Sequence, residues 1–465
     1  MPTEKYRHWV TELQQGKKRP AYLLIADLIE SDIDRGVLQT RDRLPALRDL
    51  ADLLSLNYTT VTRAYKEASN RGLIDSHPGS GSFIKGKTHT LPLRNGSDIE
   101  MTMNSPPEIE DAALIQQVRD DMNRTLASQD LPSLLRYQDF GGSITDKEAG
   151  ALFLHALFPR MEPQRILVCP GIHSALLALL SLHCSKSNSL CVGSLVYPGL
   201  KAIAAQLGIQ LLSVDSDQQG PRLRALETLC KAEKIHTLYV NPTLQNPSTA
   251  SMSRARREGI ADLALRYNLT LIEDDAYGLV PEIKHPPIAT YAPELTYYIN
   301  GFSKCFGAGC RTAYLYAPTK LATQRVAGAL RALSVMSSPI TTSLATRWIQ
   351  NGTVSKVTQA QRQQSRALQQ LAKTVLHPLK YQYHGDGFHL WLPLPKSFSA
   401  NPSDVAVYLR NHGISAVSSA AFCTDNNPPD AIRLCLGGAV NQKELQQRLI
   451  LLRDTLQDSG SLMLM

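Results

Sequence analysis

Hydrophobic positions near the start of the chain recur at the spacing of short helices. Between residues 21 and 33, apolar side chains return every three or four positions, and Gly36 ends the pattern. Residues 44–54 predict a second short helix, and residues 58–70 predict a third, with Asn57 as its N-cap. This part of the chain therefore predicts a small helical unit.

Residues 73–84 predict a β-hairpin, because two short strand-like runs flank a centre rich in glycine and serine. Three helices followed by a hairpin are typical of a winged helix-turn-helix, whose third helix enters the major groove of DNA. Short polar and basic side chains on that helix can reach base edges and phosphates, namely Thr59, Thr60, Thr62 and Arg63. A small helical adaptor is the alternative.

The periodic pattern is lost at residues 86–107, where glycine and proline punctuate a polar stretch. We interpret this stretch as a linker between an N-terminal domain, residues 1–85, and a large domain, residues 108–465. In the large domain, short apolar strands alternate with longer helical segments, which predicts an α/β fold around a mostly parallel sheet. The predicted strands are residues 166–169, 190–192, 237–240, 269–272 and 297–299.

Composition changes this picture little. The net charge of +8 is compatible with an acidic partner such as nucleic acid but does not establish one. The eight cysteines show no CxxC pair and no zinc-ligand spacing, so we expect buried, reduced thiols in a cytoplasmic protein and no metal site. We expect neither a signal peptide nor a membrane helix, because no apolar run reaches roughly 18 residues.

Candidate chemistry centres on Lys304, which follows the last predicted strand. Ser303 precedes it, Gly307 and Gly309 follow, and Arg311 lies seven residues downstream. A buried lysine can form a Schiff base with an aldehyde, and arginine offers a planar, charged fork to phosphate oxygens. In isolation, the same run also fits a surface loop.

Further candidates follow other predicted strands. Gly171, Ile172 and His173 lie between a strand and a helix, where free backbone N–H groups can bind an anion. An ordinary turn is the alternative there. Tyr197 can stack on a flat ring and Asn246 supplies a fixed polar group, although each also fits a turn.

Charged residues end or interrupt two more strands. Glu273, Asp274 and Asp275 are consecutive carboxylates, which we expect to be solvated or bound to something cationic, a metal ion included. Asp274 could pair with a protonated ring nitrogen, and Tyr277 could approach a phenolic oxygen. Arg433 interrupts an apolar strand, where a buried guanidinium needs a partner such as a carboxylate.

One segment of the N-terminal domain resembles the GntR-type DNA-binding domain: LPALRDLADLLSLNYTTVTRAYKEASNRGLIDSHPGSGSFI. It has the Leu-Pro before an arginine on the second helix, the Thr-Val-x-Arg-Ala-Tyr recognition helix and the Gly-Ser-Gly-Ser-Phe wing. The resemblance implies DNA contacts by Arg48, Thr60, Arg63 and the wing tip at Gly79.

The order of motifs over residues 108–460 resembles fold-type I, aspartate-aminotransferase-like enzymes, whose cofactor is pyridoxal 5′-phosphate. The resemblance implies a mostly parallel sheet and a smaller C-terminal α+β subdomain. It assigns the Schiff base to Lys304, the ring nitrogen to Asp274 and the α-carboxylate of an amino acid to Arg433. It also assigns the phosphate to Gly171, Ile172, His173, Ser303 and Arg311, the phenolic oxygen to Asn246 and Tyr277, ring stacking to Tyr197, and the neighbouring subunit's phosphate to Tyr137.

Five places depart from that pattern. His173 stands where Gln or another polar residue is common, and the Gly141-Gly142 region lacks the Leu-Arg dipeptide usual after it. Ile172 and Gly301 stand where relatives often have hydroxyl side chains, and Thr249 replaces a glycine. The changes at Ile172 and Gly301 each remove a possible contact to phosphate, so they put the affinity for the cofactor in doubt.

A GntR-type head joined to an aminotransferase-like domain is the arrangement of the MocR group of regulators. The resemblance implies a pyridoxal-phosphate-dependent transcriptional regulator, a homodimer whose large domain is the sensor and dimerisation module. Its partners would be double-stranded DNA and, as effector, an amino compound or the cofactor itself. The alternative is an active aminotransferase with an accessory DNA-binding head, and a half-transamination is compatible with both.

Overall fold

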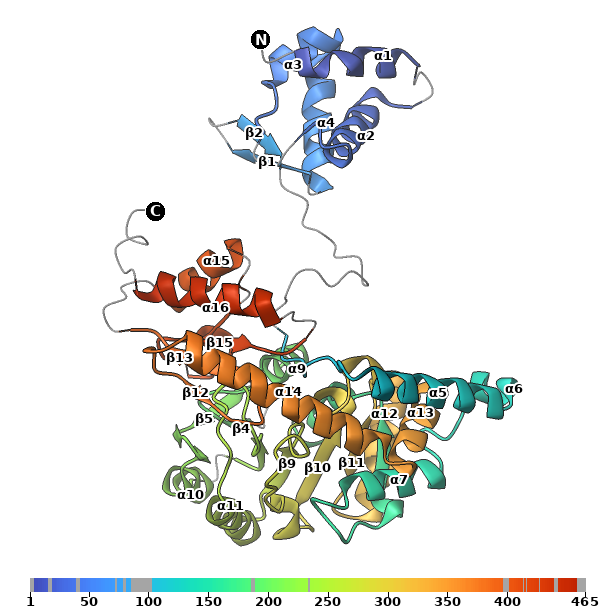
Figure 1. The fold of residues 1–465 in the computed structure, drawn as a ribbon, viewed down its shortest axis with the longest axis vertical. Coiled ribbons are helices and arrows are strands. Elements are labelled where there is room, and N and C mark those ends of the chain that lie inside the picture. The colour runs from blue at the N-terminus through green and yellow to red at the C-terminus, as the bar shows by residue number, and fades with distance from the viewer. Residues whose placement is uncertain are drawn as a thin grey trace. The chain divides into compact units, whose positions relative to one another are not determined.

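Two compact units, Met1–Gly96 and Ser97–Met465, make up the chain (Figure 1). The computed structural model describes residues 4–15, 19–38, 42–71, 73–77, 81–84, 103–184, 189–232, 235–395, 401–412, 414, 416–425, 427–438 and 442–457.

The smaller unit, where it is described, contains four α-helices and then a β-hairpin. Its elements are η1 (Glu4–Tyr6), α1 (Arg7–Gln15), α2 (Ala21–Asp34), α3 (Leu47–Leu54), α4 (Tyr58–Asn70), β1 (Ile74–His77) and β2 (Gly81–Ile84), and the two strands pair antiparallel. The predicted helices and hairpin are present. α3 begins later than predicted, because Ala46, which follows a proline, has an extended backbone.

Helix α1 was not predicted, and it completes the core of this unit. Trp9 is fully buried, and its Nε1 donates to Asp32 Oδ2 at 2.8 Å. The ring of Tyr6 packs edge-on against Trp9, with 5.0 Å between ring centroids. Tyr6, Trp9, Val10 and Leu13 pack on this core at helical spacing. The stripe is short and lies in a polar stretch.

A mostly parallel sheet forms the centre of the larger unit, as predicted. In the described part of the chain its seven strands have the order β3-β11-β10-β9-β8-β4-β5. They are β3 (Ile166–Cys169), β4 (Leu190–Gly193), β5 (Leu211–Val214), β8 (Thr237–Val240), β9 (Thr270–Asp274), β10 (Thr296–Gly301) and β11 (Ala313–Tyr316). β11 is antiparallel to both neighbours, and the other pairs are parallel. β5 and β11 were not predicted.

Helices cover both faces of this sheet. One face carries α8 (Ile172–His183), α9 (Pro198–Leu207) and α12 (Lys320–Ser334). The other carries α7 (Ile144–Leu154), α13 (Pro339–Gln350), α10 (Leu223–Lys231) and α11 (Arg254–Tyr267). In β3, Leu167 and Cys169 pack on the first face and Ile166 and Val168 on the second, so the strand is apolar throughout.

The long helix α14 (Thr353–Val375) leads to the predicted α+β subdomain, whose sheet has the order β12-β13-β15-β14 (Figure 1). Its elements are β12 (Gln382–Tyr383), β13 (His389–Pro393), α15 (Pro402–Asn411), β14 (Val417–Ser418), β15 (Ala431–Cys435) and α16 (Gln442–Gln457). The remaining elements of the larger unit are α5 (Ala112–Ser128), α6 (Leu131–Leu135), η2 (Pro163–Arg165), β6 (Ser216–Asp217), β7 (Gly220–Pro221), η3 (Ile288–Thr290), η4 (Phe302–Lys304), η5 (Ala308–Cys310) and η6 (Ser419–Ala421).

The cysteines are all free thiols, and all except Cys310 are buried, as predicted. Among the described residues, no cluster of histidine, cysteine or carboxylate side chains could hold a metal ion. No helix within the described ranges has the length and apolar character needed to cross a membrane.

Candidate functional site

The carboxyl ends of several parallel strands meet at one cavity of about 410 Å³. Residues from the loops that follow these strands line it, together with side chains from the C-terminal subdomain. The predicted residues that line it are Ile172, His173, Tyr197, Asn246, Asp274, Tyr277, Ser303, Lys304, Arg311 and Arg433. The fold therefore brings together residues that are far apart in sequence.

Lys304 ends η4, directly after β10. Its Nζ donates to the backbone carbonyl of Asn104 and lies 5.7 Å from the centroid of the Tyr277 ring. Burial lowers the pKa of Lys304 to about 8, although the carboxylate of Asp274 acts in the opposite direction. Near neutral pH such a lysine has an appreciable fraction of free amine, which is the form that attacks an aldehyde.

Asp274 is the last residue of β9 and faces the cavity. The hydroxyl of Tyr239 donates to its Oδ2 at 2.8 Å, and the backbone N–H of Ala276 donates to its Oδ1 at 3.3 Å. Burial raises the pKa of Asp274 to about 6, and these two hydrogen bonds oppose that rise. The site therefore presents one buried carboxylate that is charged at neutral pH.

The neighbouring carboxylates of Glu273 and Asp275 bind other groups of the protein. Glu273 accepts hydrogen bonds from two backbone N–H groups of η3, at 2.8 and 2.9 Å, and lies 3.8 Å from Arg257. Asp275 Oδ2 accepts from the Tyr298 hydroxyl at 3.0 Å. All three carboxylates are buried, so the cluster is not solvated, and the alternative expectation of a cationic partner holds for Glu273 beside Arg257. The reason is that β9 continues to Asp274 and carries the cluster into the core.

A tight turn and an arginine face each other at one end of the cavity. Gly171 has a φ of 85° at the start of α8, and a Cβ there would lie 2.9 Å from Arg311 Nη2. Burial lowers the pKa of His173, and the nearby charge of Arg311 adds to that effect. With Ser303 also on the wall, this end offers backbone N–H groups, a hydroxyl and a guanidinium to an anion.

Arg433 enters the cavity from β15 and is almost completely buried. Its Nη1 donates to Asn246 Oδ1 at 3.4 Å, and its Cζ lies 5.6 Å from the centroid of the Phe422 ring. The backbone N–H of Asn246 donates to Asn241 Oδ1 at 3.1 Å, which fixes the loop. Tyr197, on the same cavity wall, is the N-cap residue of α9.

The cavity is also lined by four residues that were not predicted, namely Asn104, Tyr239, Asn241 and Phe422. Asn241 Nδ2 donates to the Asp274 backbone carbonyl at 2.6 Å. Tyr239 lies near the end of a predicted strand and Asn241 directly after it, a position that could have identified both. Asn104 had no such signal, because it lies in the predicted linker. Residues 103–107 instead pack into the larger unit.

Tyr137 does not line the cavity of its own chain. It follows α6, and 78% of its surface is exposed. The structure explains one departure from the family pattern, Gly301, and shows that another, Thr249, stands where glycine is favoured. A Cβ on Gly301 would lie 2.8 Å from the carbonyl oxygen of Thr312, so a serine or threonine would clash there. Thr249 has a φ of 63°, the left-handed conformation that glycine adopts most easily.

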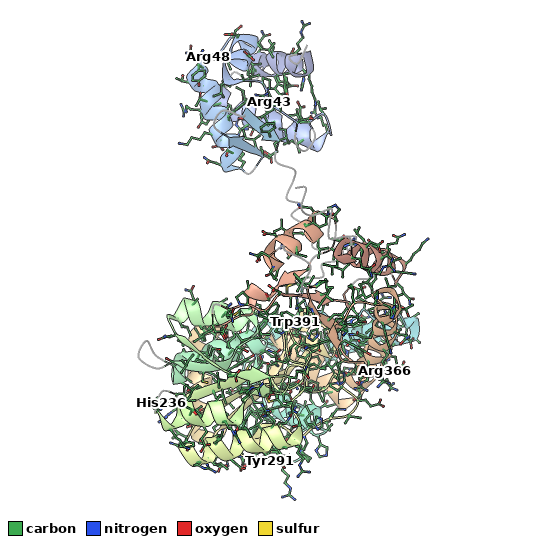
Figure 2. The ribbon with its side chains drawn as sticks, turned by 90° about the vertical axis from the view of Figure 1, so that its left-hand side faces the viewer. Arg43, Arg48, His236, Tyr291, Arg366 and Trp391 are labelled. Atoms are coloured by element: carbon green, nitrogen blue, oxygen red, sulfur yellow. The ribbon has the colours of Figure 1, made fainter. Side chains whose placement is uncertain are left out.

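The predicted DNA-contact residues lie on α3 and α4. Thr59, Thr62 and Arg63 are exposed on α4, and Thr60 is half-buried. Arg48 is exposed on α3, and Figure 2 labels it together with Arg43, which lies beside the hairpin.

Two of these side chains already have partners within the unit. Thr62 Oγ1 donates to the Tyr58 carbonyl at 2.9 Å, and the Arg63 guanidinium lies 4.3 Å from the centroid of the Tyr22 ring. Asn57 occupies the N-cap position of α4, but its side chain makes no capping hydrogen bond. Gly79 lies outside the described residues.

Two family descriptions match the chain. Residues 21–84 match the bacterial regulatory proteins of the gntR family, and residues 98–449 match aminotransferase class I and II. YdeF of Bacillus subtilis (strain 168), described as an uncharacterized HTH-type transcriptional regulator, is 29% identical over 97% of both chains. PdxR of Corynebacterium glutamicum, described as an HTH-type pyridoxine biosynthesis transcriptional regulator, is 28% identical over 68% of this chain and 69% of its own.

A solved structure shares the fold of the larger unit. The α-aminoadipate aminotransferase LysN from Thermus thermophilus superimposes with a TM-score of 0.69, at 19% identity, over 78% of this chain and 93% of its own.

The cofactor of the aminotransferase class I and II family is pyridoxal 5′-phosphate, and the residues of the cavity fit it. The close approach of Arg311 to Gly171 leaves a cradle that a larger side chain would fill. The lysine with a lowered pKa and the buried carboxylate of Asp274 supply the chemistry that an aldehyde and a ring nitrogen need. The chain belongs to the aminotransferase class I and II family, and its GntR-type DNA-binding domain gives it the arrangement of a MocR-type regulator.

Proposed function

We propose that the protein is a pyridoxal 5′-phosphate-dependent transcriptional regulator whose larger unit senses a small amino compound. The observation that supports it most directly is the grouping of Lys304, Asp274 and Arg433 around one cavity, in a chain that also carries a winged helix-turn-helix. A protein of this kind acts on double-stranded DNA in the cytoplasm. Its domains are residues 1–85 for DNA and 108–465 for the cofactor, joined by residues 86–107.

Each residue of the cavity has a role in this proposal. Lys304 holds the aldehyde carbon, and Asp274 keeps a proton on the ring nitrogen. Arg433 binds the carboxylate of the effector. Phosphate contacts come from Gly171, Ile172, His173, Ser303 and Arg311, phenolic-oxygen contacts from Asn246 and Tyr277, and ring stacking from Tyr197. The bound cofactor supplies a carbonyl for amines and an electron-withdrawing ring.

A second copy of the chain is proposed to cover an apolar surface on the larger unit. α5, α6 and α7 all pack on α13, and they and the residue Tyr137 after α6 expose several large apolar side chains. These are Leu126 (45% exposed), Leu131 (61%), Leu135 (69%), Tyr137 (78%), Ile144 (53%) and Leu152 (55%). An exposed apolar patch of this kind is typical of an interface. A homodimer built on it would bring Tyr137 to the partner subunit, as its proposed phosphate contact requires.

The DNA contacts are proposed to come from α3, α4 and the wing. With α4 in the major groove, the short hydroxyl side chains of Thr59, Thr60 and Thr62 would contact base edges. Arg48 and Arg63 would place positive charge near phosphates. Gly79 at the wing tip would approach the sugar–phosphate backbone.

The experiment needs the purified full chain loaded with the cofactor. Its visible absorbance is followed during titration with a panel of amino acids and amines, and DNA binding is measured with each compound present. The DNA fragments lie upstream of its own gene and of pyridoxine-biosynthesis genes, because the relative PdxR is described as a regulator of that pathway. We expect at least one compound to change both the spectrum and the DNA affinity. A colourless protein, or one that binds none of the fragments, contradicts the proposal.

The second candidate function is an active aminotransferase with an accessory head. It is favoured by the same observation, because Lys304, Asp274 and Arg433 are also what a transamination needs. Repeated turnover between an amino acid and a keto acid, together with no DNA binding, would select this function. A single spectral conversion without turnover is compatible with the regulator.

A further inference from the structure

The first described residues of the larger unit enter the cofactor cavity. Met103 and Asn104 line it, directly after the stretch that joins the two units. Lys304 Nζ donates to the backbone carbonyl of Asn104, and Asn104 Nδ2 donates to the Tyr277 hydroxyl at 2.6 Å. One residue of the predicted linker therefore contacts both the lysine and a tyrosine of the cofactor site.

Asn104 is a buried residue whose hydrogen bonding is incomplete. Only 5% of its surface is exposed, and its Oδ1 has no hydrogen-bond partner among the residues that the structure describes. A buried acceptor without a donor costs about 1–3 kcal/mol, so such a group is rarely left without a reason. Here the free acceptor belongs to a residue on the cavity wall, where a bound amine or hydroxyl can donate to it.

Immediately after Asn104, the chain is held against the end of β15. Cys435 Sγ donates to the Ser105 carbonyl at 3.5 Å, and the backbone N–H of Gly438 donates to the Pro106 carbonyl at 3.0 Å. Gly437 has no room for a Cβ, which would clash with the Ser105 carbonyl oxygen. Asn104 and the residues after it are thus held against the larger unit, and the Asn104 carbonyl, which lies in the peptide group shared with Ser105, connects Lys304 to this segment.

We propose that Asn104 couples the bonding state of Lys304 to residues 103–107, the end of the predicted linker that packs into the larger unit. The coupling rests on the proposed function, because it requires Lys304 to be the residue that holds the aldehyde carbon. The hydrogen bond from Lys304 to the Asn104 carbonyl is the contact that would connect effector binding to the linker, and both residues are described.

The number of N–H groups on Lys304 changes with its bonding state. A free lysine ammonium has three N–H donors. When Lys304 is bonded to the aldehyde carbon, the aldehyde oxygen has left as water and the nitrogen keeps at most one N–H. When another primary amine takes over that carbon, Lys304 leaves as a free amine, with no net oxidation or reduction. Lys304 then regains its donors and can donate to the Asn104 carbonyl, as in this structure.

An amino-compound effector is therefore expected to fix Asn104, and the cofactor-loaded protein without effector is expected to hold it less firmly. The test uses the full chain loaded with pyridoxal 5′-phosphate. Hydroxylamine is the added amine, because it takes the aldehyde carbon from a lysine whatever the natural effector is. Visible absorbance reports that Lys304 has left, and hydrogen–deuterium exchange reports the backbone amides of residues 104–111. We expect exchange to slow roughly tenfold, since a hydrogen bond from a charged donor contributes about 1.5–3 kcal/mol.

Two substitutions test the coupling, and each is read only in protein whose absorbance shows that the cofactor is bound and that Lys304 has left. Asn104→Ala removes the hydrogen bond to Tyr277 that positions the carbonyl. Exchange should then not respond to hydroxylamine in protein whose absorbance shows that Lys304 has left. Tyr277→Phe removes the acceptor of the same bond and should also abolish the response. The control is Glu108→Gln, an exposed residue of the same segment, which should keep the wild-type response.

The possible results distinguish the two proposals. If absorbance changes in the wild-type protein but exchange does not, the coupling is refuted and the proposed function stands. If Asn104→Ala keeps the exchange response, Asn104 is not the coupling residue. If the wild-type absorbance does not respond to hydroxylamine at all, Lys304 does not hold the aldehyde carbon and the proposed function itself fails.

Discussion

Replacing Tyr239 by phenylalanine removes one oxygen atom beside the carboxylate that the cofactor needs. The hydroxyl donates to Asp274 Oδ2 at 2.8 Å, and both residues are buried. The ring itself packs among apolar side chains between the sheet and its helices, so phenylalanine keeps that packing. The substitution therefore isolates the effect of a single hydrogen bond on the carboxylate.

The expected size of the effect follows from that bond. A hydrogen bond to a charged group contributes about 1.5–3 kcal/mol, and one pKa unit corresponds to about 1.4 kcal/mol. Burial already raises the pKa of Asp274 to about 6 in the presence of the Tyr239 hydroxyl. Without that hydroxyl we expect a further rise of about one to two units. The carboxylate form predominates only above the pKa, so Tyr239→Phe should carry a largely protonated Asp274 at neutral pH.

The assay is a spectrophotometric titration of the cofactor-free protein with pyridoxal 5′-phosphate between about pH 5 and pH 9. Wild-type affinity should fall as pH decreases through about 6, because a protonated Asp274 cannot hold the ring nitrogen in its charged form. In Tyr239→Phe the same fall should occur one to two pH units higher. Tyr267→Phe is the matched control, since its hydroxyl bonds to Glu227 at 3.3 Å, outside the cavity. An unchanged pH midpoint in Tyr239→Phe would refute the reasoning.

Three further predictions concern stability, cofactor attachment and DNA binding. Arg257→Met leaves Glu273 buried without its cation and should lower the free energy of unfolding by about 3–5 kcal/mol in urea titrations. The control Arg254→Met removes the exposed ion pair with Glu258 and should change that free energy little. Lys304→Ala should abolish the visible absorbance of covalently held cofactor; absorbance that survives dialysis would show a different attachment site. Arg63→Ala should weaken DNA binding at all sequences by a similar factor in anisotropy assays and leave the cofactor spectrum unchanged. A lost cofactor spectrum would point to unfolding instead.

Local sequence patterns predicted those helices and strands whose own residues show a clear apolar periodicity or an apolar run beside turn residues. The helix at 58–70 has the predicted limits, because a buried face recurs at helical spacing along it. Strand β3 likewise has its predicted limits, as a short apolar run beside turn residues. The antiparallel strand β11 was missed, because its role between β3 and β10 depends on long-range pairing that no local pattern contains.

In the candidate site, too, some residues were predicted from local patterns and others have roles that depend on distant partners. Lys304, Asp274 and Arg433 were predicted because charged residues at the ends or in the middle of apolar strands need an explanation. The roles of Glu273 and Asp275 could not be predicted, because they depend on partners such as Arg257 and on the exact end of β9. Their burial with separate partners leaves Asp274 as the carboxylate of the cluster that faces the cavity.

The position of Arg433 gives the sensor a physical basis for responding to an effector. A ligand shifts an equilibrium only when it binds the two arrangements with different affinity. Lys304 lies in η4, directly after β10 of the main sheet, whereas Arg433 belongs to β15 of the C-terminal subdomain. An amino acid attached at the Lys304 end of the cavity and paired with Arg433 through its carboxylate would span both parts. Such a ligand therefore favours the arrangement of the two parts in which the distance between Lys304 and Arg433 matches its length.

Hydrogen bonds to backbone carbonyls already connect the two parts beside this cavity. The N–H of Val196 donates to the Phe422 carbonyl at 2.9 Å, and the Thr424 hydroxyl donates to the Gly193 carbonyl at 2.9 Å. Lys201 Nζ donates to the Cys423 carbonyl at 2.6 Å. Any movement that opens the cavity here must break these bonds, and a ligand that fits between Lys304 and Arg433 opposes that movement. An amine without a carboxylate engages only the Lys304 end, so it should release Lys304 without holding the subdomain in place.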